Sequence, residues 1–208
     1  MRLITRRFFG TAAASLAMAG AGTAAAQSAP VYKEFIHGDA KAKLTVIEYA
    51  SLTCPHCADF AISVWPQVKK NYIDTGKIRF VFRDYPLDQL AMAGAMLARC
   101  APGDRGKNMI ELMFKKQQDW VRAPQPLEPL KQYALLSGMS AADVDACLKN
   151  EALLKIIKEE QNKATSLYKV QATPTFYIGD EKLDGLAPGE AGYAQIAKVI
   201  DKQLAKAK

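Results

Sequence analysis

Cysteine and histidine are scarce in this sequence, with four cysteines and two histidines among 208 residues. A structural zinc site needs four Cys or His ligands in a compact pattern, usually two Cys pairs or one pair followed by histidines. Cys100 and Cys147 are isolated, and the histidine outside the Cys54–Cys57 segment is His37. Haem attachment needs a histidine directly after the second cysteine of a pair, where this chain has Ala58. The sequence therefore argues against both sites, and we expect no metal and no cofactor.

Long apolar runs and blocks of basic residues are also absent beyond the first 26 residues. No later segment approaches the ~20 apolar residues that a membrane-spanning helix needs. The net charge is +7, but three of the 28 basic residues lie in the first seven positions. The small surplus that remains gives no reason to expect nucleic acid as a partner. Because no repeat or Pro-, Gly- or Ser-rich linker follows, we expect a single compact domain over residues 27–208.

The first 26 residues have the organisation of an export signal. Met1–Arg7 is basic, an apolar stretch follows, and Ala24–Ala26 before Gln27 supplies the small residues of a signal-peptidase site. The segment Thr5–Phe9 (TRRFF) resembles the twin-arginine signature, and an ordinary Sec signal is the alternative. Both routes end outside the cytoplasm, in a compartment that permits disulfides. We therefore expect residues 1–26 to be a signal peptide that is cleaved near Ala26.

The residues after position 43 have the pattern of a βαβ unit. Residues 44–49 are apolar and β-branched, as in a strand that is covered on both faces, and the acid within this run, Glu48, calls for an explanation. Apolar residues at four-residue spacing predict a helix after Cys54, with a kink at Pro66 and a stop at residues 75–76. Residues 78–82 predict a second strand, parallel to the first.

Residues 88–168 carry no strand signal and are expected to form a block of helices. Proline, glycine and capping residues divide the block, and the predicted helices span residues 89–101, 107–120, 128–137, 141–150 and 151–168. A β-hairpin is expected at 175–178 and 181–183, and a last helix from about Glu190. The predicted order is βαβ, helical block, ββα, which makes the fold class α/β.

The segment that carries the chemistry is Cys54-Pro55-His56-Cys57, where the first strand ends and the helix begins. Two thiols with two residues between them can form a small disulfide. At the start of a helix, unpaired backbone N–H groups and the helix dipole stabilise a thiolate, which makes the first thiol a better attacking and leaving group. The segment indicates a redox-active pair, and a purely structural short-range disulfide is the alternative.

Three segments carry a family resemblance: Glu48–Cys57 (EYASLTCPHC), Phe82–Leu87 (FRDYPL) and Ala172–Phe176 (ATPTF). Together they resemble the DsbA family of thiol:disulfide interchange proteins, and the similarity covers nearly all of residues 33–206. The resemblance implies a thioredoxin fold with an inserted helical domain at about residues 88–168. It also implies a periplasmic oxidase that donates its active-site disulfide to reduced or unfolded exported proteins. A quinone-linked membrane protein that resembles DsbB would then reoxidise it.

The resemblance also assigns roles within the Cys54–Cys57 segment. It makes Cys54 the exposed nucleophile and Cys57 its buried partner. Pro55 and His56 would set the redox poise, because an imidazole beside the Cys54 thiolate stabilises the reduced form. The alternative is that His56 is a bystander on an exposed helical turn.

Outside this segment the resemblance points to Thr173, Pro174 and Glu48. Thr173 and Pro174 would form the family's cis-proline loop, whose backbone can pair with an extended substrate segment; a plain trans turn is the alternative. Glu48 matches the family's buried acid, a proton acceptor for Cys57 with a raised pKa. The alternative is that Glu48 pairs with a lysine and has no redox role.

Cys100 and Cys147 fall in separate helices of the predicted block. DsbA relatives from alphaproteobacteria resemble this chain in having a second disulfide there, so we expect a structural bridge that resists mild reductant. Two buried free thiols are the alternative.

Two other functional classes stay open beside the oxidase. A disulfide isomerase or reductase of the same fold is one, although relatives of the isomerase type usually carry an N-terminal oligomerisation segment. Only residues 27–42 separate the leader from the first predicted strand, so we expect a monomer and favour the oxidase. A redox-inert peptide-binding or copper-binding module is the other, and an active-site redox potential would exclude it.

Overall fold

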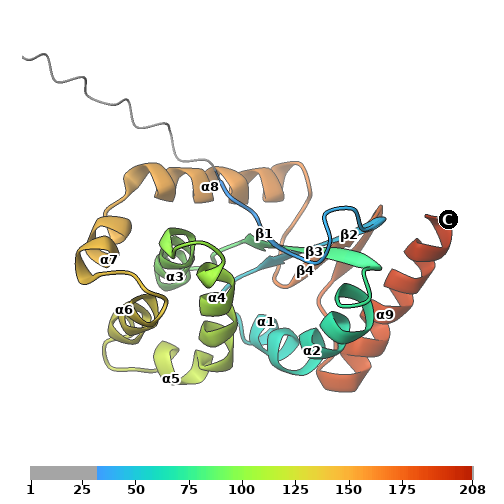
Figure 1. Cartoon of the computed structure of the whole chain (residues 1–208), viewed down its shortest axis with the longest axis horizontal. Coiled ribbons are helices and arrows are strands. Elements are labelled where there is room, and N and C mark those ends of the chain that lie inside the picture. The colour runs from blue at the N-terminus through green and yellow to red at the C-terminus, as the bar shows by residue number, and fades with distance from the viewer. Residues whose placement is uncertain (1–31, 208) are drawn as a thin grey trace, which may run out of the picture.

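The computed structural model describes residues 32–207, in which a five-stranded sheet forms the centre of the protein (Figure 1). The predicted signal peptide, residues 1–26, lies outside the described residues. The strands are β1 Phe35–His37, β2 Leu44–Ala50, β3 Ile78–Asp84, β4 Thr175–Ile178 and β5 Glu181–Asp184, in the spatial order β1-β3-β2-β4-β5. β2 and β3 are parallel and the other neighbouring pairs are antiparallel. The α/β fold class and the βαβ unit are therefore confirmed.

Strand β1 has no counterpart in the sequence analysis. Three residues are too few to show the alternation that marks a strand. It forms by pairing with β3, which places Phe35 opposite Phe82, and both rings are buried. Burial of these two rings, rather than local propensity, accounts for the strand.

The helix after β2 is continuous but irregular. It consists of α1 (Pro55–Asp59), the π-helical segment η1 (Phe60–Val64), α2 (Trp65–Val68) and a second π-helical segment, η2 (Lys69–Ile73). Pro66, where the sequence predicts a kink, lies in the first turn of α2, directly after η1. A proline lacks the N–H that an α-helix interior would need, and the wider π turn before it accommodates this.

Helices α3 to α8 form the inserted block between β3 and β4 (Figure 1). Their bounds are α3 Gln89–Cys100, α4 Arg105–Lys115, α5 Gln117–Val121, α6 Leu127–Leu136, α7 Ala141–Leu148 and α8 Glu151–Ser166. The single helix predicted over residues 107–120 is wrong, because the chain breaks at Lys116 into α4 and α5. Hydrogen bonds from the side chains of Trp120 and Gln117 stabilise the break, and hydrogen bonds of polar side-chain atoms leave no trace in the hydrophobic periodicity. The last helix, α9, spans Gly189–Lys206.

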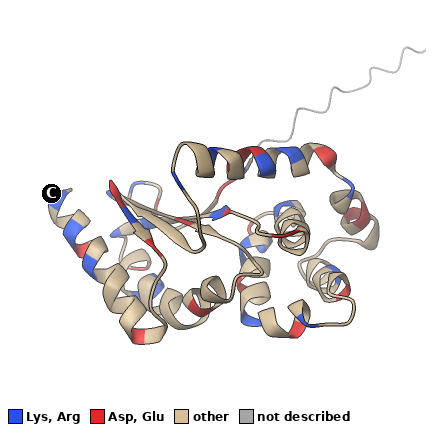
Figure 2. Ribbon diagram, turned by 180° about the vertical axis from the view of Figure 1, so that it is seen from behind, with Lys and Arg blue, Asp and Glu red and all other residues tan. Residues whose placement is uncertain are grey.

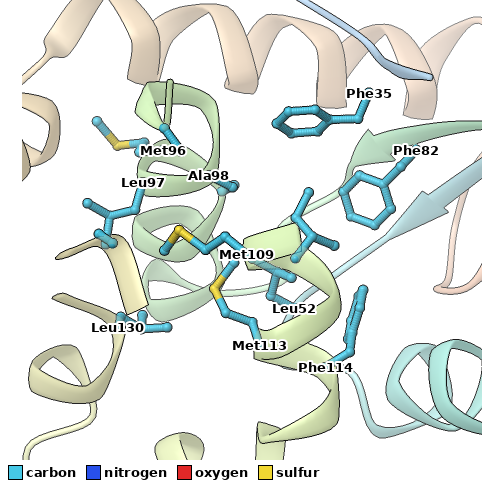
Figure 3. Close-up of a cluster of buried hydrophobic side chains, with 14 of the residues drawn as sticks. Phe35, Leu52, Phe82, Met96, Leu97, Ala98, Met109, Met113, Phe114 and Leu130 are labelled. Carbon is cyan, nitrogen blue, oxygen red and sulfur yellow. The ribbon is translucent and has the colours of Figure 1, made fainter. Parts of the chain in front are cut away.

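Leu52, in the loop between β2 and α1, joins the active-site end of the sheet to the core of the inserted block. Figure 3 places its side chain among Met109, Met113 and Phe114 of α4. Leu52 is only 2% exposed. Helix α3 comes this close because Gly94 has no side chain: a Cβ there would lie 2.8 Å from Cδ1 of Leu52. The loop before the CPHC segment is thus anchored by core packing.

A second hydrophobic cluster lies between the sheet and the helical segments η1, α2, η2 and α9. The ring of Phe60 lies 6.0 Å from that of Phe80 and 4.8 Å from that of Phe176, and Ile196 of α9 is fully buried among them. Glu48 of β2 is in register with Phe176 of β4, so both side chains leave the sheet on this face. The acid of β2 is therefore directed into an apolar layer.

Basic and acidic residues are interspersed along the outer helices α8 and α9 (Figure 2). Ion pairs such as Lys163–Glu160 and Lys202–Glu181, both 2.7 Å, account for part of this pattern. Within residues 32–207, no helix combines the length and the apolar character that crossing a membrane requires.

Candidate active site

Cys54 is the N-cap residue of α1, directly after the loop that follows β2. Its backbone is extended, with φ −77° and ψ 122°, and the backbone N–H groups of His56 and Cys57 at the start of the helix help to lower the pKa of its thiol. Pro55 lies in the first turn of the helix, where its missing N–H has no helical partner to lose. The sequence therefore places a thiol where the unpaired donors of a helix start converge.

Cys54 and Cys57 are both free thiols, and both are buried, with exposed fractions of 6% and 0%. The prediction that Cys54 is exposed is therefore wrong. Its thiol lies against the loop before β4, where it donates to the carbonyl oxygen of Thr173 at 3.3 Å. Pro55 and His56 are the exposed members of the segment, so another protein would meet them before it meets the sulfur.

The pKa values of the two thiols are shifted in opposite directions. The pKa of Cys54 is lowered to about 5, chiefly because the Cys57 thiol donates a hydrogen bond to the thiolate. Burial opposes this effect, while the backbone N–H groups of Cys57 and His56 reinforce it. Burial and the hydrogen bond to Cys54 raise the pKa of Cys57 well above its usual range. At neutral pH the pair is therefore a thiolate and a thiol, and His56 takes part through its backbone N–H.

Glu48 lies beneath this pair, 3% exposed. Burial, and next the charge of Cys54, raise the pKa of its carboxyl well above the usual range, and its charge in turn raises the pKa of Cys57. Its Oε1 atom has no hydrogen-bond partner among residues 32–207, and no lysine there forms an ion pair with it. The carboxyl instead lines a cavity of about 30 Å³, together with Phe60, Phe82 and Phe114. That volume admits a water molecule.

Thr173 and Pro174 form the loop that covers Cys54, and the peptide bond between them is cis. The Thr173 hydroxyl is buried and has no hydrogen-bond partner among the described residues. Thr173, Pro174 and the exposed His56 line a groove of about 540 Å³ with residues 183–187. The structure thus brings the CPHC segment, Glu48 and this loop together, as the resemblance implies.

Gln117 also belongs to the site, and the sequence analysis gave no indication of it. Its side-chain amide is 3% exposed and donates to the carbonyl oxygens of Leu52 and Cys54, at 2.8 and 2.9 Å. In the predicted continuous helix it would be one polar residue among several. The feature that points to Gln117 is the break between α4 and α5, which depends on tertiary contacts and is therefore seen only in the structure.

Cys100 of α3 and Cys147 of α7 are joined by a disulfide, with their Cα atoms 6.2 Å apart. The bridge lies within the inserted block and is no part of the CPHC site. It spans 47 residues in sequence, for which loop-closure entropy gives a stabilisation of roughly 4 kcal/mol. Within residues 32–207, no group of three or more His, Cys, Asp or Glu side chains is arranged to hold a metal ion.

Comparisons with known proteins agree with this geometry. A family model described as thioredoxin matches residues 30–202. The crystal structure of alpha-DsbA1 from Wolbachia pipientis superimposes with a TM-score of 0.74 at 30% identity, covering 86% of this chain and 94% of that one.

Curated relatives show the same likeness. A protein of Rickettsia conorii, provisionally named a protein-disulfide oxidoreductase, is 30% identical over 176 residues, which cover 84% of this chain and 62% of the relative. This chain thus spans less than two thirds of that relative's length. Disulfide bond formation protein D of Bacillus subtilis is 26% identical, over 80% of this chain and 75% of that protein. The chain therefore belongs to the thioredoxin family, as a protein of the DsbA type.

Proposed function

We propose that this protein is a thiol:disulfide oxidoreductase that acts as a dithiol oxidase, with the Cys54–Cys57 disulfide as the group that it donates. The observation that carries the proposal is the opposite shift of the two thiols, a pKa of about 5 for Cys54 and a raised pKa for Cys57. Donors that stabilise the Cys54 thiolate stabilise the reduced protein. A disulfide whose reduced form is stabilised is readily given to another dithiol.

The exchange proceeds in two displacements. A substrate thiolate attacks the Cys54 sulfur, a mixed disulfide forms, and Cys57 leaves with the electron pair and takes up a proton, which its raised pKa favours. A second substrate thiol, after losing its proton to solvent, attacks the substrate sulfur of the mixed disulfide. Cys54 then leaves as a thiolate, which its low pKa favours. The substrate gains a disulfide and the protein retains the two electrons.

Glu48 is the group that we assign to the proton of Cys57. During reoxidation the Cys57 thiol must lose its proton before its sulfur can attack, and a nearby carboxylate can accept it. Burial raises the pKa of the Glu48 carboxyl well above its usual range, which favours its holding the proton once accepted. The adjoining cavity has room for the water through which the proton can leave.

The groove beside His56, Thr173 and Pro174 is the proposed site for the substrate chain. The Thr173 carbonyl oxygen lies 3.3 Å from the Cys54 sulfur, and the Thr173 backbone can pair with an extended substrate segment. Reaching the sulfur requires the substrate to enter between this loop and the exposed Pro55 and His56. An unfolded or extended chain fits such a groove better than a folded surface does.

We place the reaction in the periplasm, on exported proteins, with a DsbB-like quinone oxidoreductase of the membrane for reoxidation and the protein acting as a monomer. The export pattern of residues 1–26 supports the location. The Cys100–Cys147 disulfide also supports it, because such bridges persist in oxidising compartments. The name of the Bacillus subtilis relative, a disulfide bond formation protein, agrees with the direction of the reaction.

The test is catalysed oxidation of a reduced model peptide with two cysteines, together with the equilibrium constant against glutathione. Wild-type protein should form the peptide disulfide rapidly, Cys54→Ser should not, and a Cys100→Ala/Cys147→Ala double variant should retain the activity. A protein that fails to oxidise the peptide contradicts the proposal.

The alternatives give different results in the same assays. An isomerase would rearrange a scrambled multi-disulfide substrate faster than it oxidises a reduced one. A reductase would reach equilibrium with glutathione mostly in its oxidised form, and a redox-inert peptide- or copper-binding module would exchange with neither partner.

A further inference from the structure

The break between α4 and α5 turns a side chain of the inserted block toward the active site. Helix α4 ends at Lys115 and α5 begins at Gln117, with Lys116 between them at φ −107° and ψ 17°. The indole N–H of the fully buried Trp120 donates to the Met113 carbonyl at 2.7 Å, which compensates for the helical hydrogen bonding that the break disturbs. The break is thus a stabilised feature of the fold.

The side-chain amide of Gln117 hydrogen bonds to the loop that carries the nucleophile, Cys54. Its Nε2 atom carries two hydrogens, and it donates to the carbonyl oxygens of Leu52 and Cys54 at 2.8 and 2.9 Å. The side chain is 3% exposed, so water cannot readily replace it, and each carbonyl would lose a buried partner if the amide were removed. These two carbonyls flank Thr53, the residue before the nucleophile.

Gln117 supplies one of the two hydrogen bonds to the Cys54 carbonyl, in a loop whose other contacts lie before that carbonyl. Leu52 is anchored by its side chain in the core of the block, and the Thr53 hydroxyl donates to Asp88 at 2.6 Å. The Cys54 N–H donates to the Ser51 carbonyl at 3.1 Å. The Cys54 carbonyl accepts from Ala58 N at 3.2 Å, in the first turn of α1, and from Gln117.

We propose that Gln117 is a positioning residue for the redox reaction. By binding the Cys54 carbonyl it fixes the peptide unit that leads from Cys54 into α1, and with it the direction of the His56 and Cys57 N–H groups in the first turn of that helix. The inserted block thereby sets how well the thiolate is stabilised, and so how oxidising the disulfide is. This inference rests on the proposed function, because it concerns the same thiolate.

The test compares Gln117→Met with Gln118→Met. Methionine has nearly the length of glutamine but no donor, and Gln118 is the exposed neighbour on the same helix, so its replacement is the matched control. Thiolate absorbance during a pH titration reports the pKa of Cys54, and equilibration with glutathione reports the redox equilibrium. Gln117→Met should raise the pKa and lower the equilibrium constant for glutathione oxidation about three- to tenfold, the loss of about one hydrogen bond. Gln118→Met should change neither.

A merely structural role for Gln117 predicts a different result. The variant would then destabilise the reduced and oxidised forms equally, and the glutathione equilibrium would stay at the wild-type value; that outcome overturns the proposal. If Gln117→Met does not fold, Gln117→Glu takes its place in the same two measurements. Glutamate has the same shape as glutamine, with acceptors in place of the donors, and the expected result is the same. Wild-type protein separates the two hypotheses: if it is itself a poor oxidant the proposed function fails, whereas an oxidising wild type with an unchanged variant refutes only the role of Gln117.

Discussion

The relative stability of the reduced and oxidised protein should reverse with pH. In the reduced protein the pKa of Cys54 is about 5, against an ordinary value of 9.0. A group whose pKa is lowered on folding contributes stability that is fully present above its unfolded pKa and is lost as the pH falls through its folded pKa. Between pH 9 and pH 5, the reduced form should therefore lose about 1.4 kcal/mol per pH unit relative to the oxidised form.

The oxidised form has an opposing advantage, because the Cys54–Cys57 disulfide constrains the unfolded chain. Loop-closure entropy gives about 2 kcal/mol for so short a loop. At pH 7, two units above the folded pKa of Cys54, the thiolate contributes about 2.7 kcal/mol, so the reduced form should be more stable by about 1 kcal/mol. The two effects balance at about pH 6.4, below which the oxidised form should be more stable.

Guanidinium unfolding of both forms, from pH 5 to pH 8, measures this difference. Glutathione buffers should set the state of the active-site pair while the Cys100–Cys147 bridge stays closed. A Cys54→Ser/Cys57→Ser variant is the control, and its stability should not depend on the buffer. Burial is the largest cause of the raised pKa of Glu48, and the charge of Cys54, which only the reduced form carries, adds to it. An oxidised form that is more stable at every pH, or a difference that does not vary with pH, refutes the reasoning.

Three further predictions concern the thiols and the loop that holds them. Cys57→Ala should accumulate mixed disulfides with exported proteins, because nothing within the site resolves them; a non-reducing gel that shows none contradicts the assignment. Titration with dithiothreitol, alkylation and peptide mapping should label the active-site pair well before Cys100 and Cys147, and the reverse order would exchange the structural and catalytic pairs. Leu52→Ala should lower the free energy of unfolding by about 3 kcal/mol, since Leu52 is 2% exposed, whereas Leu136→Ala, at a residue 78% exposed, should leave it nearly unchanged.

Contiguous motifs made much of the site predictable. Cys54 and Cys57 lie three positions apart in the chain, and the strand before them and the helix after them follow from the hydrophobic pattern. Pro174 lies directly before β4, whose bounds, Thr175–Ile178, match the predicted 175–178. Glu48 stood out as an acid within an apolar strand, and it is buried in the structure. In each case the information is local.

The features that sequence analysis missed depend on contacts between distant segments. Strand β1 forms because Phe35 meets β3, and Cys54 is covered because Thr173, more than a hundred positions away, lies against it. The inward direction of Gln117 follows from a helix break that Trp120 stabilises. Hydrophobic periodicity describes one helix or strand at a time. It cannot predict these contacts, because the two residues of each contact belong to different segments.

The structure gives the Cys54 thiolate neutral hydrogen-bond donors in place of a paired cation. The Cys57 thiol lowers the pKa of Cys54 most, and the backbone N–H groups at the start of α1 lower it less. A buried anion held by oriented dipoles depends on their direction, since a small tilt weakens each hydrogen bond, whereas an exposed ion pair depends mainly on ionic strength. Residues that fix the backbone around Cys54 can therefore influence its acidity without touching the sulfur. On this reasoning the inserted block, which anchors Leu52 and supplies Gln117, belongs to the redox centre as well as to the core.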